Sequence, residues 1–321
     1  MKLAILPLVL LLAGCSPARA PGGGGIASQK IVSTNPCADA ILIDLVPANR
    51  IAAISHYSQD PGATSIPLDV AKRFASTTGT AEEVIALNPA LVLTSSFTPA
   101  STRTAYERAG LKTLLLDSPV TIAASKAQVL QIADAVGATE RGRALNVRID
   151  RAVASARPEP GADNPSALLF IAGDLVNGSG TLLDELLAKA GFRDAAIDYG
   201  LAFTGTLPIE TIAAKPPRVI LTPGPSRTAT LRARVLARTG ANTVEAAFPR
   251  TLVNCGGPTI IPAITRLAAI RRSLDSRPPS SPLPAGEGRA AQQRGVRVTG
   301  PVALTLPPLR GSLPLPLGEG K

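Results

Sequence analysis

Only four side chains of the 321-residue chain belong to the histidine and cysteine types that dominate nucleophilic and soft-metal chemistry. They are His56, Cys15, Cys37 and Cys255. A free zinc or manganese site needs several histidine and carboxylate ligands, and a lone histidine leaves little machinery for general-base catalysis. The sequence also contains no nucleophile elbow. It contains no phosphate-binding loop either, because GSG at 178–180 is too short to form one. These residues therefore predict a binding protein rather than an enzyme.

The N-terminus has the pattern of an export signal. Lys2 precedes LAILPLVLLLAG, an apolar run too short to remain as a membrane-spanning helix. The run ends in LAGC at 12–15, which resembles the bacterial lipobox, where cleavage precedes a cysteine that receives a diacylglycerol. We expect a signal peptide over 1–14, lipidation of Cys15 that anchors the protein to a membrane surface, and a flexible tether over 15–29. The alternative is an ordinary secretory signal with an incidental cysteine.

Export would leave Cys37 and Cys255 as a pair in an oxidising compartment, which favours a disulfide between them. Two alternatives stay open at this stage. The thiols are free, or they are soft ligands to a metal.

One pattern occurs twice in the chain. GTAEEVIALNPALVLTSS starts at Gly79 and GTLPIETIAAKPPRVILTPG starts at Gly205. Each copy predicts a short helix, a proline that ends it and an apolar strand, and the two prolines are Pro89 and Pro216. The repeat indicates two related α/β lobes.

Apolar strands alternate with helices along most of the chain, which is typical of a parallel sheet. Strands are expected at 30–34, 50–55, 91–94, 111–117, 166–172, 218–222 and 250–254. Residues 121–158 have helical periodicity and no strand, with a break expected near Gly137. The predicted organisation is an N-terminal lobe over 30–120, these connecting helices, a C-terminal lobe over 159–275, and a disordered Pro/Gly-rich tail over 276–321.

The formal net charge of +10 does not indicate nucleic-acid binding. The charges are scattered, and no basic run is interleaved with aromatic residues. Part of the excess lies in residues 276–321, outside the expected lobes.

From Lys30 to Leu274 the chain resembles the periplasmic substrate-binding proteins of ABC importers for vitamin B12, iron–siderophore complexes and haem. The matching stretches are KIVSTNPCADAILIDLVPANRIAAISHYSQDP, GTAEEVIALNPALVLTSS, AGLKTLLLD, GTLLDELLAKAGF and NCGGP with the helix that follows it. The resemblance implies an α/β fold of two Rossmann-like lobes with parallel sheets, joined by a single long helix. It also implies a ligand cleft between the lobes.

Ligands of open α/β sheets lie outside the carboxyl ends of the strands. Together with the resemblance, this rule predicts eight ligand-binding residues: Asn35, Pro36, His56, Tyr57, Phe97, Asn177, Phe203 and Arg227. Tyr57 is expected to supply an aromatic contact. His56 is either an axial ligand to iron or cobalt or a solvated loop residue. Phe97 and Phe203 line either the cleft or the core, and Arg227 is a candidate partner for a carboxylate or phosphate.

The resemblance implies that the protein binds a corrinoid or a ferric chelate, needs no cofactor of its own, and delivers the ligand to a permease and its ATPase. We expect a monomer, with Glu107 and Glu210 as candidate docking residues for the permease. A haem binder and a ligand-sensing or structural lipoprotein of the same fold are the alternatives. The chain has no tryptophan, although B12-binding members often use tryptophan in the cleft.

Overall fold

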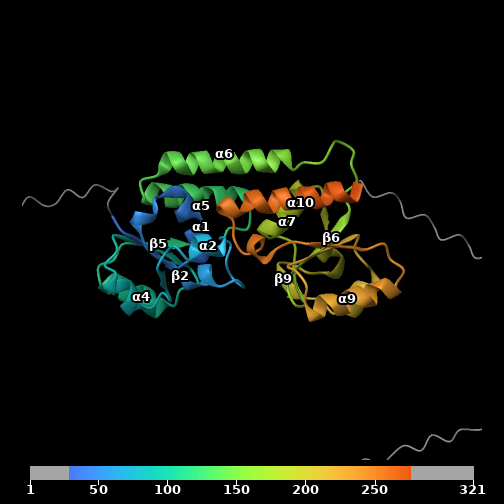
Figure 1. The fold of residues 1–321 in the computed structure, drawn as a ribbon, viewed down its shortest axis with the longest axis horizontal. Helices are drawn as coiled ribbons and strands as arrows, with labels where there is room; N and C mark the ends of the chain where they lie inside the picture. The colour runs from blue at the N-terminus through green and yellow to red at the C-terminus, as the bar shows by residue number, and fades with distance from the viewer. Residues whose placement is uncertain (1–28, 276–321) are drawn as a thin grey trace, which may run out of the picture. The chain divides into compact units, whose positions relative to one another are not determined.

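The structure is a computed structural model that describes residues 29–275. The expected signal peptide, the lipidation site Cys15 and the expected tail lie outside these residues. The described part contains two sheets, one in each lobe (Figure 1). No helix within residues 29–275 combines the length and the apolarity needed to cross a bilayer.

The N-terminal sheet has five strands in the order β3-β2-β1-β4-β5, and all of its pairings are parallel. The strands are β1 (Ile31–Ser33), β2 (Ile51–Ser55), β3 (Ser76–Thr77), β4 (Leu91–Ser95) and β5 (Thr113–Leu116). Because every strand runs in the same direction, all five carboxyl ends meet at one edge of the sheet. That edge is where the expected site residues of this lobe begin.

Helix α1 (Pro36–Leu45) starts at a cap formed by Asn35 and Pro36. The side-chain oxygen of Asn35 accepts hydrogen bonds from Cys37 N and Ala38 N at 3.0 and 3.4 Å, and Pro36 is the first helical residue. An N-cap acceptor followed by proline satisfies the free amides at a helix start. Cys37 is therefore held in the first turn of the helix, directly after β1.

The repeated motif forms the same unit in both lobes. In the first lobe α3 (Ala81–Ala86) leads into β4, and in the second lobe α8 (Ile209–Ala214) leads into β10 (Val219–Thr222). In both sheets the strand of this unit lies between the first strand of its lobe and an edge strand. The prediction of two related lobes is confirmed.

The C-terminal sheet has the path β11-β10-β6-β7-β9, with β8 (Arg193–Asp194) also paired to β6. Its other new strands are β6 (Ser166–Ala172), β7 (Leu175–Asn177), β9 (Thr204–Thr206) and β11 (Val244–Ala247). This sheet is mixed rather than parallel, because β7 pairs antiparallel with both β6 and β9. The sequence analysis predicted no strand over 173–180, because GDLVNGSG is too short and glycine-rich to give a strand pattern.

One strand prediction is wrong. Residues 250–254 were expected to form the last strand, but 250–252 form a 3₁₀ turn, η5 (Arg250–Leu252), and the edge strand is β11. The sequence of β11 is VEAA, and alanine and glutamate are weak strand formers, so its pairing with β10 decides its conformation.

Three helices lie along the backs of the lobes (Figure 1). They are α5 (Ile122–Ala135) over the N-terminal lobe, α10 (Ile260–Asp275) over the C-terminal lobe, and α6 (Thr139–Ser155) packed against both helices. Gly137, between α5 and α6, adopts a left-handed φ of 68°, as expected for a residue that ends a helix. A single apolar core extends from Ile31 in β1 through Ile149 in α6 to Leu221 in β10. The lobes therefore share a continuous core along their backs, which limits how far they can move apart.

Candidate ligand-binding cleft

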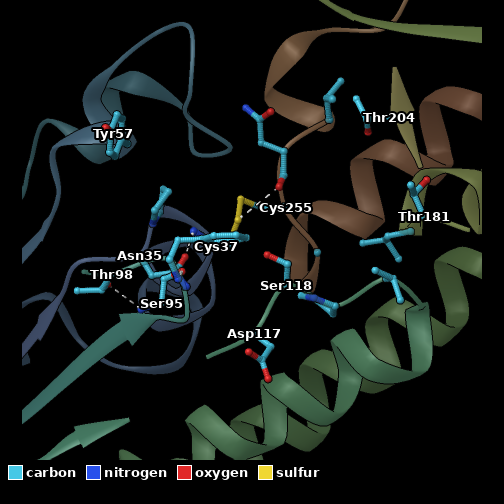
Figure 2. Close-up of a pocket in the computed structure, with 18 of the residues that line it drawn as sticks. Asn35, Cys37, Tyr57, Ser95, Thr98, Asp117, Ser118, Thr181, Thr204 and Cys255 are labelled. Atoms are coloured by element: carbon cyan, nitrogen blue, oxygen red, sulfur yellow. Dashed lines mark hydrogen bonds between the residues drawn. A yellow bond between two sulfur atoms is a disulfide. The ribbon is translucent and has the colours of Figure 1, made fainter. Parts of the chain in front are cut away.

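A cavity of about 740 Å³ lies between the two lobes. All five strands of the first sheet contribute to it from their carboxyl ends. The lining residues of this lobe are Thr34, Asn35, Pro36, Cys37, Tyr57, Thr78, Gly79, Ser95, Phe97, Thr98, Pro99, Asp117, Ser118, Pro119 and Val120. Ile171, Asn177, Thr181, Leu182, Leu183, Thr204, Val253, Asn254, Cys255 and Gly256 line the opposite wall. Figure 2 shows how these two groups of residues face each other.

Two aromatic side chains of the first lobe line the cavity while remaining exposed. Tyr57 is 51% exposed and Phe97 is 80% exposed. Both rings are therefore accessible to a molecule that enters the cavity. Tyr57 belongs to the 3₁₀ turn η3 (His56–Gln59), directly after β2.

A buried carboxyl group holds the turn that carries Tyr57. Asp39 Oδ2 in α1 accepts hydrogen bonds from Ser55 N at 2.9 Å and from Ser58 Oγ at 2.7 Å, on either side of Tyr57. Burial raises the pKa of Asp39 to about 7, although the hydrogen bonds to this group act in the opposite direction. The other oxygen, Oδ1, is buried, and no hydrogen bond to it is formed within residues 29–275.

Two of the expected ligand-binding residues, Asn35 and Asn177, line the cavity, but their side-chain amides already form hydrogen bonds within the protein. Asn35 caps α1 through its side-chain oxygen. Asn177 is 2% exposed, donates to Gly178 O at 3.0 Å and accepts from Thr181 Oγ1 at 3.0 Å. Asn177 thus supports the start of α7 (Leu182–Lys189), where Thr181 is the N-cap and accepts from Asp184 N at 3.2 Å. Pro36 also lines the cavity.

Three expected ligand contacts do not reach the cavity wall. His56 stacks on Tyr57 with ring centroids 4.0 Å apart, and its Nδ1 lies 3.3 Å from the Thr77 carbonyl oxygen. Phe203 has a left-handed φ of 60°, its ring lies near Gly180, and its neighbour Thr204 lines the cavity instead. Arg227 is the first residue of α9 (Arg227–Arg238) and lies outside the lining.

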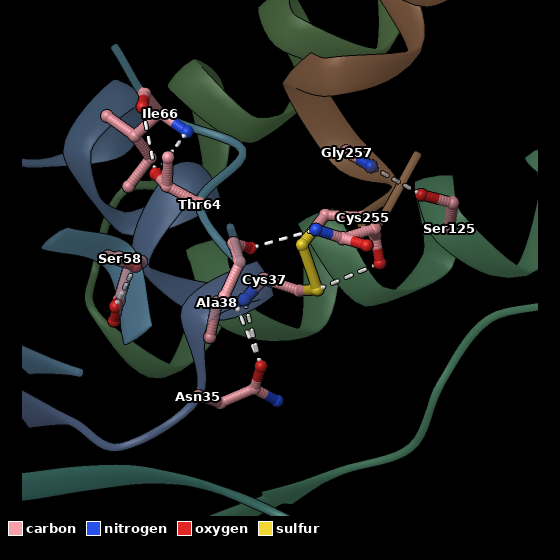
Figure 3. The surroundings of a disulfide bond; sticks show 12 residues. Asn35, Cys37, Ala38, Ser58, Thr64, Ile66, Ser125, Cys255 and Gly257 are labelled. Carbon is pink, nitrogen blue, oxygen red and sulfur yellow. Dashed lines mark hydrogen bonds between the residues drawn. A yellow bond between two sulfur atoms is a disulfide. The ribbon is translucent and has the colours of Figure 1, made fainter. Parts of the chain in front are cut away.

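Cys37 and Cys255 form a disulfide across the cavity, with their α-carbons 5.1 Å apart (Figure 3). Both cysteines line the cavity. The loop that carries Cys255 makes two further contacts with other parts of the chain. Asn254 Nδ2 donates to Ala63 O at 2.9 Å, and Gly257 N donates to Ser125 Oγ at 2.7 Å. We call residues 254–257 the hinge-side loop, because it joins the second lobe to the first beside α10.

The sequence analysis missed several polar residues of the cleft, of which Asp117 is the most informative. It is the only acidic residue that lines the cavity in the described part of the chain, and no lysine or arginine lines it. Asp117 follows β5, a strand that the sequence predicted. The rule that ligands lie at the carboxyl ends of strands would have identified the loop 117–120 if it had been applied to that strand.

The two candidate docking residues lie outside the cavity. Glu107 is exposed on α4 (Ala100–Arg108) of the first lobe, and Glu210 is exposed on α8 of the second. Their role in docking remains a prediction.

Within residues 29–275, no group of three or more histidine, cysteine, aspartate or glutamate side chains is arranged to hold a metal ion. The lining of the cleft, with its two exposed rings and few polar side chains, suits a molecule held by its shape and by a few polar contacts.

Comparisons with known proteins agree with this arrangement. The sequence profile described as "Periplasmic binding protein" matches residues 31–255. A comparison with curated protein sequences gave no match. Among solved structures, periplasmic haem-binding protein HutB of Vibrio cholerae matches with a TM-score of 0.63 and 17% identity, covering 76% of this chain and 99% of its own.

Two further structures are similar. RhuT from Roseiflexus sp. RS-1, a periplasmic haem-binding protein in apo form, has a TM-score of 0.61 and 22% identity, with 75% and 97% of the two chains covered. A periplasmic haem-binding protein from Pseudomonas aeruginosa has a TM-score of 0.60 and 22% identity, with 75% and 92% covered. The chain belongs to the periplasmic binding protein family.

Proposed function

We propose that this protein captures haem in the cleft and delivers it to an ABC permease. The observation that carries the proposal is Tyr57, whose ring is half exposed at the cavity wall. Tyrosine is one of the protein side chains that hold haem iron. The buried Asp39 fixes the turn on both sides of this tyrosine, so the phenol is presented in a defined position.

The size and lining of the cavity support the same ligand. Its volume of about 740 Å³ falls within the range of small-molecule sites, roughly 300–1,000 Å³. The exposed ring of Phe97 offers an aromatic face to a flat macrocycle. The similar solved structures named above are haem-binding proteins, which favours haem over the corrinoid or ferric chelate expected from the sequence.

His56 has a supporting role in this proposal. A carbonyl oxygen can only accept, so His56 Nδ1–H donates to Thr77 O, and the imidazole is held against the tyrosine ring. In this position His56 limits the rotation of Tyr57. It is then not the axial ligand that the sequence analysis considered.

The proposal is tested by titrating the purified protein with ferric haem and following the Soret absorption. We expect saturable binding of one haem. Tyr57→Phe keeps the ring and removes the phenol oxygen, so it should weaken binding by about tenfold to a hundredfold and change the spectrum of the bound iron.

The matched control is Tyr199→Phe, since the Tyr199 hydroxyl donates to Lys215 O outside the cavity. Equal affinities of the two variants would remove Tyr57 from the site. No saturable Soret change would remove haem as the ligand, and titration with cobalamin and ferric siderophores would then test the ligands expected from the sequence.

Attachment to the membrane through Cys15 and docking to the permease through Glu107 and Glu210 complete the proposed function. A lipid anchor would keep the loaded protein near the membrane. One exposed carboxylate on each lobe would offer the permease two separated points of contact.

A further inference from the structure

A second cavity, of about 260 Å³, lies within the C-terminal lobe. It forms where β6 and β10 end, and the loop 223–226 and the first turns of α9 enclose it. None of its lining residues also lines the cleft. Two charged residues line it in the described part of the chain, and both are arginines, Arg232 and Arg250. We call it the arginine cavity.

Arg232 is buried with unused hydrogen-bonding capacity. Only 4% of the residue is exposed, its Cζ lies 3.8 Å from the centre of the Phe170 ring, and its Nε has no hydrogen-bond partner within residues 29–275. A buried charged group without hydrogen bonds is costly, and natural proteins normally give such a group a partner.

The acidic neighbours of Arg232 do not supply that partner fully. Its Nη2 lies 4.0 Å from Glu245 Oε1, which is beyond hydrogen-bond distance, and that oxygen already accepts from Thr222 Oγ1 at 3.2 Å. Burial lowers the pKa of Arg232, and the charges of Glu245 and Asp174 offset this effect only in part.

The other side of the arginine cavity is open and positively charged. Arg250 is exposed at the start of η5, and no hydrogen bond or ion pair of its side chain is formed with the described residues. Gly224 has a φ of 143°, and no atom lies within 4 Å of the position that a β-carbon would take there. The cavity is therefore lined by one exposed arginine, Arg250, and one buried arginine, Arg232.

We infer that the arginine cavity binds a small oxyanion, a carboxylate or a phosphate, between Arg232 and Arg250. The planar guanidinium group presents a fork of N–H donors that matches the oxygens of both anions. The volume is below that of most sites for drug-sized ligands, so the occupant is a small anion or the acidic end of a larger molecule.

The test is a titration of the purified protein with inorganic phosphate and with acetate, followed by calorimetry at constant ionic strength with chloride as the balancing salt. We expect saturable binding of at least one of the two anions. Arg250→Ala should weaken it by about tenfold or more, because a hydrogen bond to a charged group is lost.

Arg234→Ala is the matched control, since Arg234 is exposed on α9, the helix that carries Arg232, and does not line the cavity. It removes the same charge and should leave the affinity unchanged. Arg232→Lys keeps the charge but loses the fork, so it should also weaken binding while the thermal melt shows that the variant is folded. The inference is overturned if neither anion binds saturably, or if Arg250→Ala and Arg234→Ala have the same affinity.

Two sources can provide the anion, and the experiment separates them. If the anion is a free solute, phosphate and ferric haem bind independently. If it is the acidic arm of the molecule in the cleft, phosphate competes with ferric haem, and Arg250→Ala weakens binding of haem but not of its dimethyl ester. The phosphate titration contains no haem. It therefore still tests the anion site if haem fails to bind to the cleft.

Discussion

At the scale of single residues, Asp39 links the stability of the first lobe to its binding surface. The side chain is fully buried in α1, and it bonds to the turn that carries Tyr57. A raised pKa means that the folded protein holds this proton more tightly than the unfolded chain does. The contribution to the free energy of unfolding is therefore complete below about pH 4 and is lost as the pH rises to about 7.

Asp39→Asn removes this titration while keeping a side-chain oxygen as acceptor. We expect the free energy of unfolding of the wild type to fall between pH 4 and 7 relative to that of the variant, by up to about 4 kcal/mol at about 1.4 kcal/mol per pKa unit. Denaturant unfolding across this pH range measures the difference. Asp69→Asn, on the exposed side of α2 (Leu68–Ala71), is the control. Parallel profiles of the wild type and Asp39→Asn would contradict the assignment.

At the scale of elements, the close packing of α5 against α6 depends on one small residue. Gly142 is buried in α6, and a β-carbon placed there would lie 2.5 Å from Ala133 Cβ in α5. Such a distance is shorter than van der Waals contact. The two helices can therefore approach this closely only without a side chain at this position.

Gly142→Ala should destabilise the protein by about 1–3 kcal/mol, because the added methyl group forces the helices apart. Helix propensity alone predicts the opposite sign, because alanine is favoured over glycine in a helix by roughly 1 kcal/mol when packing is not affected. A loss of stability would therefore report on the packing. The double variant Gly142→Ala/Ala133→Gly restores the space and should recover part of the loss. Thermal unfolding of the three proteins checks this, and a single variant as stable as the wild type would show that the packing is not tight.

At the scale of the whole described unit, the two lobes are connected along their backs by the shared core and at the cleft by the disulfide. The disulfide closes a segment of 218 residues. It lies at the hinge-side loop together with the bonds of Asn254 and Gly257. This arrangement favours small movements of the lobes over a wide opening.

Removing the disulfide should lower the free energy of unfolding by about 2–5 kcal/mol, given the length of the segment that it closes. The variant Cys37→Ser/Cys255→Ser should unfold at a lower denaturant concentration than the oxidised wild type. Dithiothreitol should destabilise the wild type and leave the double variant unaffected. If the wild type is equally stable with and without reductant, the disulfide does not contribute to stability.

Several elements of both lobes follow from local sequence. The cap at Asn35 and Pro36, the repeated helix–proline–strand unit and the buried strand β6 each have a local signal, because capping groups, proline and apolar runs act within a few residues. The presence of Tyr57 and Phe97 in the cleft also follows from the rule that ligands lie at the carboxyl ends of strands.

The remaining features depend on contacts between distant parts of the chain. Strand β7 pairs antiparallel with β6 across a tight turn and with β9, which lies much later in the chain. Both strands are short, and their conformation depends on this pairing rather than on a local strand pattern. The buried Arg232 lies on a helix whose sequence does not distinguish it from the exposed Arg234. The sequence alone determined two related lobes and a binding role. Only the tertiary structure decided which side chains line each cavity, since burial and orientation depend on packing between segments.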